Sequence, residues 1–158
     1  MAALEDLPAS PGSYALWFDL PVDVRRKIGR LGEFDFPRGS YLYFGSAHGP
    51  GGLCARVHHH RRVAAHPRWH LDWLRPELSL IGIWFTTAPG NWECAWSQAI
   101  LELPGVTIPA PGFGAADCRS GCAAHLVELP GLTTPNAIAG VLEDAMNRLP
   151  GEVVWLSA

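Results

Sequence analysis

Two tyrosines in one short stretch are the first residues of this chain whose types and spacing suggest chemistry. Tyr41 and Tyr43 lie in residues 39–47, which read Gly-Ser-Tyr-Leu-Tyr-Phe-Gly-Ser-Ala. Residues two apart on a strand share a face, so we expect the phenols side by side on a strand that ends at a glycine-rich loop. Gly45 would let a ligand approach the backbone there. The alternative is that both tyrosines pack as core residues with hydrated hydroxyls.

A short basic window follows this strand. The formal net charge of −3 argues against a protein that coats nucleic acid by bulk charge. Arginines gathered in one window could still bind phosphate, because each guanidinium is a planar donor fork. Consecutive histidines on a helix point in different directions, so at most one of them should face Tyr43. A solvated helix face is the alternative for the window. Its basic residues are Arg56, His58, His59, His60, Arg61, Arg62, His66, Arg68 and His70.

A third group combines cysteine with histidine late in the chain. Cys118, Cys122 and His125 could hold zinc, with a fourth ligand from His58, His60, His70 or Asp117. Their spacing is not one of the strong zinc patterns, in which a second ligand pair follows at a distance. We therefore expect a loop with small buried thiols and keep zinc as the alternative.

His70 and Asp72 are a fourth candidate pair, within Trp-His-Leu-Asp at 69–72. Helical geometry separates residues two apart, so the pair does not by itself define one site. A buried, hydrogen-bonded His70 that braces the core is an equal alternative.

The elements that must position these residues follow from hydrophobic periodicity and turn residues. An α/β (α+β) fold is expected, with a small, mostly antiparallel central sheet flanked by helices. The strand around Ile28 is expected to return from the turn at Pro21 and to join the Tyr14 and Tyr43 strands in a meander. Asn91 can cap the helix that carries Glu93. The predicted strands cover 13–20, 22–31, 39–46, 78–87, 125–129 and 153–155, and the helical segments 52–65, 68–75, 92–103 and 135–148.

Length and composition predict one domain over residues 1–158, with a core at about 12–129 and a C-terminal extension at about 130–158. No apolar run approaches the roughly 18 residues of a membrane span. The acidic start Leu4-Glu5-Asp6 lacks the basic region of a signal peptide. We expect a soluble cytoplasmic protein with no membrane partner.

Four short motifs in order resemble the GIY-YIG nuclease superfamily. They are Gly-Ser-Tyr at 12–14, Tyr-Phe-Gly at 43–45, Leu-Cys-Ala-Arg at 53–56 and Glu-Cys-Ala at 93–95. Further markers, including Gly-Ser-Ala at 45–47 and Gly-Phe-Gly at 112–114, look like a little-characterised, mostly prokaryotic branch of that superfamily. The resemblance covers about residues 12–129.

The resemblance implies metal-dependent hydrolysis of DNA. It implies that Tyr14 or Tyr43 orients or deprotonates water, that Arg56 holds the phosphate, and that Glu93 alone binds a Mg or Mn ion. One of the three consecutive histidines, such as His60, could compete as the base. Contacts to the nucleic acid are expected from Gly45, Ser46, Arg61, Arg62 and Arg68.

The leading prediction is an endonuclease that acts on branched, flapped or damaged DNA in repair or recombination. The first alternative is a catalytically weak nucleic-acid-binding module with the same fold, serving an unknown protein partner. The second is a structural or zinc-binding protein built on the cysteine loop. Glu93 also has a simpler explanation, because an acidic residue in the first turn of a helix favourably meets the helix dipole.

Overall fold

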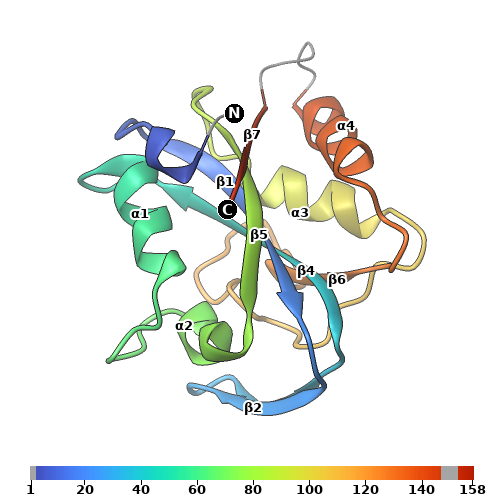
Figure 1. The fold of residues 1–158 in the computed structure, drawn as a ribbon. Helices are drawn as coiled ribbons and strands as arrows, with labels where there is room; N and C mark the ends of the chain where they lie inside the picture. Colours follow the sequence, from blue (N-terminus) through green and yellow to red (C-terminus); the bar gives the residue numbers. More distant parts are fainter. Residues whose placement is uncertain (1–2, 147–152) are drawn as a thin grey trace.

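The computed structural model describes residues 3–146 and 153–158. Its centre is a five-stranded sheet in the order β6-β4-β1-β5-β7, and every pair of neighbours is antiparallel (Figure 1). The predicted α+β class is therefore confirmed. The strands are β1 (Gly12–Leu20), β4 (Gly39–Ala47), β5 (Ser79–Thr86), β6 (Leu126–Leu129) and β7 (Val154–Ser157).

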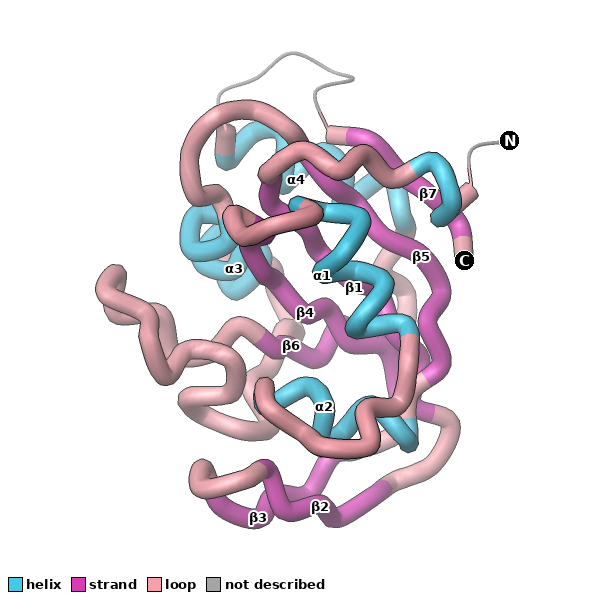
Figure 2. The backbone as a smooth tube through the Cα atoms, turned by 90° about the vertical axis from the view of Figure 1, so that its left-hand side faces the viewer, coloured by secondary structure: helices cyan, strands magenta, loops and turns pink. Residues whose placement is uncertain are grey.

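Helices cover both faces of this sheet. α1 (Gly52–Arg61) and α2 (His70–Leu74) lie over one face, and in Figure 2 they stand in front of the strands. α3 (Glu93–Leu101) and α4 (Pro135–Ala145) cover the other face. Alternation along β1 divides the core accordingly: Tyr14 and Leu16 belong to the cluster that contains α1 and α2, whereas Ala15 belongs to the other. Tyr14 and Tyr43 thus face the α1 side.

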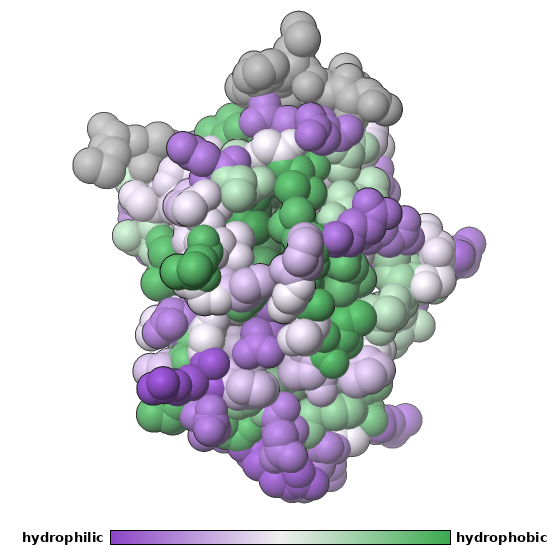
Figure 3. Space-filling view, turned by 90° about the vertical axis from the view of Figure 1, so that its right-hand side faces the viewer, coloured by the Kyte–Doolittle hydropathy of each residue, from purple (hydrophilic) through white to green (hydrophobic). Residues whose placement is uncertain are grey.

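The strand predicted around Ile28 does not join the central sheet. β2 (Val24–Ile28) pairs with β3 (Gly32–Phe36) in a separate two-stranded sheet. Both edges of β1 are taken by the longer, more apolar strands β4 and β5, so β2 has no edge to join. The meander prediction was wrong in this respect, and β3 was missed because Glu33 and Asp35 make it read as polar. Hydrophilic side chains gather at the lower end of the molecule in Figure 3, where the β2–β3 hairpin lies in Figure 1.

α1 ends four residues earlier than predicted. Arg62 has an extended backbone, and the Arg75 guanidinium donates hydrogen bonds to the carbonyls of His60 and Arg61 at 2.6 and 2.9 Å. The last carbonyls of a helix need such partners, because no further turn satisfies them. A distant side chain therefore ends α1. The remaining predicted elements occur close to their expected bounds, although residues 147 and 148 of the predicted last helix fall outside the described part of the chain.

The short strand β6 opens one edge of the sheet. It pairs with β4 only from Ser40 to Tyr43, so none of the strands in the described part of the chain lies outside the later part of β4. The start of α3 and the loop before β6 lie there instead, and Ser46 donates a hydrogen bond to Asn91 at 2.8 Å. Across residues 3–146 and 153–158, none of the helices has the length and apolar character needed to span a membrane.

Candidate functional site

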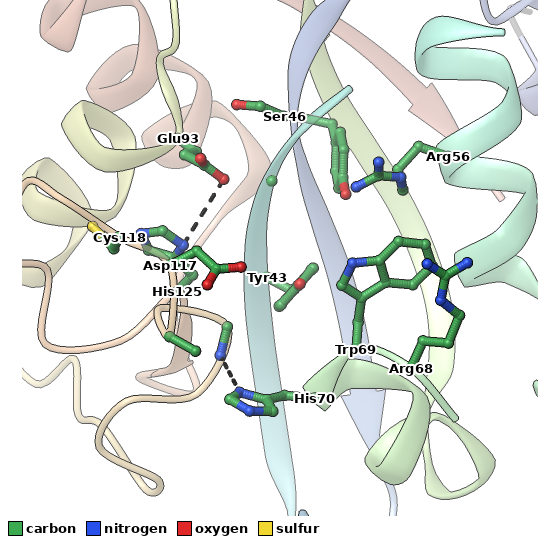
Figure 4. Close-up of a pocket in the computed structure, with 14 residues that line it drawn as sticks. Tyr43, Ser46, Arg56, Arg68, Trp69, His70, Glu93, Asp117, Cys118 and His125 are labelled. Carbon is green, nitrogen blue, oxygen red and sulfur yellow. Dashed lines mark hydrogen bonds and ion pairs between the residues drawn. The ribbon is translucent and has the colours of Figure 1, made fainter. Parts of the chain in front are cut away.

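A cleft of about 290 Å³ opens beside this edge of β4. Figure 4 shows Arg56, Arg68 and Trp69 on one side of it and Glu93, Asp117 and His125 on the other, with Tyr43 between them. Most of the predicted site residues line it: Tyr14, Tyr43, Gly45, Ser46, Arg56, Arg68, His70, Glu93, Cys118 and His125. Five predicted residues are not in its lining: His60, Arg61, Arg62, Asp72 and Cys122.

Tyr14 and Gly45 occupy directly opposite positions on β1 and β4. A Cβ atom on Gly45 would lie 2.3 Å from the Tyr14 hydroxyl oxygen, so the phenol fills the space that a side chain would take. Gly45 was predicted to admit a ligand to the backbone, and it does border the cleft. Its missing side chain first accommodates the neighbouring tyrosine. Tyr41, in contrast, is fully buried and donates to the Pro37 carbonyl.

His60 supports the two cleft tyrosines from below. It is 2% exposed, its Nε2 lies 3.1 Å from the Tyr14 hydroxyl, and its ring meets the Tyr43 ring edge-on at 5.6 Å. One of the three consecutive histidines thus faces Tyr43, as predicted, while His58 is exposed. Burial, reinforced by the charge of His59, lowers the pKa of His60 to about 3. The imidazole is therefore neutral at pH 7.

Burial dominates the electrostatics of both cleft tyrosines. It raises the pKa of Tyr14 and of Tyr43 well above the usual range, and Arg56 offsets only part of that rise. A buried phenolate lacks water to stabilise it, so the neutral phenol prevails. Arg56 alone therefore does not make either tyrosine a base. As they stand, both hydroxyls are hydrogen-bond donors.

The positive wall of the cleft is organised around Trp69. The guanidinium carbons of Arg56 and Arg68 lie 4.6 and 5.2 Å from its ring centroid, within cation–π range. Such stacking orients a guanidinium and leaves its N–H groups free for an anion. Arg61 lies near Glu5 at 3.9 Å instead, and Arg62 is exposed past the end of α1. The four arginines are close together in the sequence, but of these only Arg56 and Arg68 line the cleft.

Glu93 stands at the first position of α3, on the opposite wall. Its Oε1 accepts a hydrogen bond from Asn91 Nδ2 at 3.2 Å, and its Oε2 lies 3.9 Å from His125 Nδ1. Asn91 Oδ1 accepts from the Glu93 backbone N–H at 3.3 Å, so the predicted capping contact exists although Trp92 holds the N-cap position. The carboxylate is thus held over the cleft rather than extended into solvent.

Four possible metal ligands cluster directly behind Glu93. One ligand atom from each of Cys94, Cys118, Cys122 and His125 lies within 4.8 Å of all the others. Cys94 Sγ is 3.5 Å from Cys118 Sγ and 3.7 Å from His125 Nε2. A tetrahedral zinc site with bonds of about 2.3 Å has ligand-to-ligand edges of roughly 3.8 Å. This cluster could hold a metal ion.

The sequence reasoning missed Cys94 as the fourth ligand. It favoured a loop of small buried thiols and sought the fourth ligand among His58, His60, His70 and Asp117. The sequence did hold one indication of Cys94, because it directly follows Glu93. A helix that places Glu93 at the cleft also brings Cys94 close to the same wall. Burial, followed by the hydrogen-bonding Cys122 and Cys118 thiols, raises the pKa of Cys94 to about 12. Burial also lowers the pKa of His125, which favours the neutral ring that a metal requires.

His70 and Asp72 serve different neighbours. His70 Nδ1 accepts the Gly114 N–H at 2.8 Å and so ties α2 to the loop before β6. Asp72 is buried, accepts the backbone N–H groups of Arg68 and Trp69 and pairs with His59 at 2.9 Å. These partners lower the pKa of Asp72 against the opposing effect of burial. The two residues do not form one site, and the group of His59, His60 and Asp72 is already engaged in these contacts.

A family model for a domain of unknown function, DUF123, matches residues 13–148. The chain therefore belongs to this family. Neither the curated proteins nor the solved structures include a match to the chain.

Proposed function

We propose that the cleft hydrolyses phosphodiester bonds in DNA with the help of a divalent ion at Glu93. The observation that carries this proposal is convergence: Tyr14, Tyr43, Arg56 and Glu93 come from β1, β4, α1 and α3 and line one cleft. They are also the residues that the resemblance to GIY-YIG nucleases implies. A core packing role alone would not require an arginine and a glutamate on opposite walls.

The donor set at Glu93 fits a magnesium-type ion. The Glu93 carboxylate borders the cleft with 21% of its side chain exposed, and its Asn91 contact leaves Oε2 directed inward. Magnesium usually keeps several waters and needs only one or two protein carboxylates, together with the substrate phosphate. When bound, the ion supplies positive charge that stabilises the phosphate oxygens during displacement.

The chain's own residues have separate tasks in this proposal. Arg56, oriented by Trp69, binds the non-bridging phosphate oxygens through its planar fork. Tyr43 donates a hydrogen bond to the attacking water or to the phosphate. Tyr14 accepts a hydrogen bond from the attacking water and donates its own to His60 Nε2, 3.1 Å away, so that it orients the water. Neutral His60 has a free lone pair for that hydrogen bond.

The decisive assay incubates plain duplex, flapped and branched DNA with the purified protein in Mg, Mn or chelator. Glu93→Gln keeps the size of the side chain and removes its charge, so cleavage should fall by about a thousandfold. Asp117→Asn is the matched control, because it removes a carboxylate from the same cleft wall. Wild-type protein that cuts none of these DNAs with any metal would favour the binding module instead. Equal cleavage by Glu93→Gln would make Glu93 a helix-start carboxylate only.

We also propose zinc as the metal of Cys94, Cys118, Cys122 and His125, because three thiolates and one imidazole within 4.8 Å of one another suit zinc and not magnesium. Elemental analysis of the untagged protein should find one zinc per chain. Cys122→Ala should lose it, whereas Cys54→Ser, on α1 and outside the cluster, should keep it. If the wild-type protein is folded but contains no zinc, the zinc proposal is wrong and the cluster is only a set of buried thiols.

A further inference from the structure

The cysteine cluster and the cleft share one wall. Glu93 and Cys94 are consecutive residues in the first turn of α3, and the Glu93 carboxylate faces the cleft. His125 belongs to the cluster and also lines the cleft. A metal ion bound by the cluster would therefore act one side chain away from Glu93.

His125 presents a different nitrogen to each of these neighbours. Its Nε2 lies 3.7 Å from Cys94 Sγ. Its Nδ1 lies 3.9 Å from Glu93 Oε2, the contact that is dashed in Figure 4. The side chain is 3% exposed. Its backbone is fixed on both sides, because its N–H donates to Phe113 at 2.7 Å and its carbonyl accepts from Phe44 at 2.9 Å. The ring is thus confined between the two groups.

Metal binding decides where the proton of this ring resides. A histidine binds a metal through an unprotonated nitrogen, so a metal on Nε2 leaves the single proton of the neutral ring on Nδ1. Nδ1 is the ring nitrogen that lies near Glu93. The present separation of 3.9 Å is about 1 Å longer than a hydrogen bond, and a small movement of the carboxylate would close it.

We propose that zinc at the cysteine cluster aligns Glu93 through His125, which acts as a positioning residue between the two metal sites. Asn91 holds Oε1 from one side, and the Nδ1–H of His125 holds Oε2 from the other. In return, the carboxylate strengthens His125 as a zinc ligand. The inference rests on the proposed zinc and deepens the proposed role of Glu93, because it makes the catalytic carboxylate depend on the metal bound by the cluster beside it.

The reciprocal effect gives a test that does not require hydrolysis. Zinc affinity is measured by competition with a chromogenic chelator in the wild type, Glu93→Gln and Asp117→Asn. Loss of an outer carboxylate typically weakens metal binding by about 10- to 100-fold, so Glu93→Gln should release zinc at least about tenfold more readily. Asp117→Asn removes equal charge from the same wall and should bind zinc as the wild type does.

The forward effect is measured with Mn alone. Electron paramagnetic resonance should show several-fold weaker Mn binding in Cys122→Ala than in Cys54→Ser, although neither cysteine contacts Glu93. Nitrogen chemical shifts of His125 in the zinc-loaded protein should show the proton on Nδ1.

The outcomes separate the proposals. If Glu93→Gln binds zinc as tightly as the wild type does, the coupling between the zinc cluster and Glu93 is overturned, even if cleavage requires Glu93. A proton on Nε2 also overturns it, and absence of zinc overturns both the coupling and the zinc assignment. Weakened zinc in Glu93→Gln supports the coupling even in a protein that cuts no DNA, in which case the hydrolase proposal fails alone.

Discussion

The two walls of the cleft are held in place by different means. Tyr14 and Tyr43 stand on β1 and β4, which pair along nine residues each, and Arg56 stands on a helix packed over them. The opposite wall comes from the start of α3 and the loop before β6. That loop has a few backbone hydrogen bonds, such as Gly112 to Ala123 and His125 to Phe113, both at 2.7 Å. One wall is thus fixed by the main-chain ladder, and the other depends on side chains that converge on the cluster of Cys94, Cys118, Cys122 and His125, which could hold a metal ion.

The largest effect on kcat among these tests is expected for Arg56, on the wall that is fixed by β1 and β4. Arg56→Lys keeps the charge but not the planar fork, so kcat should fall by about a hundred- to a thousandfold, or roughly 2.7 to 4 kcal/mol. Substrate binding should stay within about tenfold. Arg62→Lys, beyond the end of α1, should retain wild-type kcat. Single-turnover cleavage separates the two effects, and an active Arg56→Lys would show that the ordered wall supplies only general charge.

Metal removal should act on the other wall alone. Chelation, or Cys122→Ala, should raise amide hydrogen exchange in residues 112–125 by about tenfold or more, which corresponds to about 1.4 kcal/mol of local stability. Amides of β1 and β4 should exchange as before. Uniform acceleration over the whole chain would mean that the cluster stabilises the fold globally and that the walls are not independent.

Acid should weaken the strand wall through His60. The folded-state pKa of about 3 lies below the ordinary value of about 6.5, so the unfolded chain binds this proton first as the pH falls. The free energy of unfolding should therefore decrease from about pH 6.5 toward 3, by at most about 1.4 kcal/mol per pH unit from this group. His60→Gln should remove that part of the slope in urea titrations. Exposed His58→Gln should not, and equal slopes in both variants would exclude His60 as the cause.

The smallest effect concerns the arginine at the rim. Arg68→Ala should reduce the slope of log affinity for DNA against log salt by about one unit, as expected for one lost phosphate contact. Arg25→Ala is the control, because Arg25 is paired with Glu33 and Asp35 on the separate hairpin. An unchanged slope for Arg68→Ala would leave Trp69 and Arg68 as a structural stack.

The same contrast explains what the sequence could predict. Tyr43 could be predicted because strand periodicity is local and determines which side chains share a face, and helix geometry indicated that at most one of the three histidines would face it. Tyr14, Arg56 and Glu93 were predicted from the resemblance to GIY-YIG nucleases. The contribution of Cys94 could not be found that way, because it lies 24 residues from Cys118 in sequence and meets it only through folding. The isolated pairing of β2 and the early end of α1 have the same origin. Each depends on a distant element: β4 and β5 occupy both edges of β1, and Arg75 closes the helix.

The fit of Tyr14 over Gly45 restricts how this chain can change. The two positions share one volume, so the sheet can accept a side chain at 45 only if the ring at 14 becomes smaller. Removing the hydroxyl alone would not suffice, because ring carbons also lie within 2.8 Å of the missing Cβ. Neither residue can therefore be replaced alone by a larger one. A tyrosine that reaches the cleft from position 14 of β1 requires a glycine at the opposite position, 45, on β4. Two motifs that are separate in the sequence are, in space, a single structural unit.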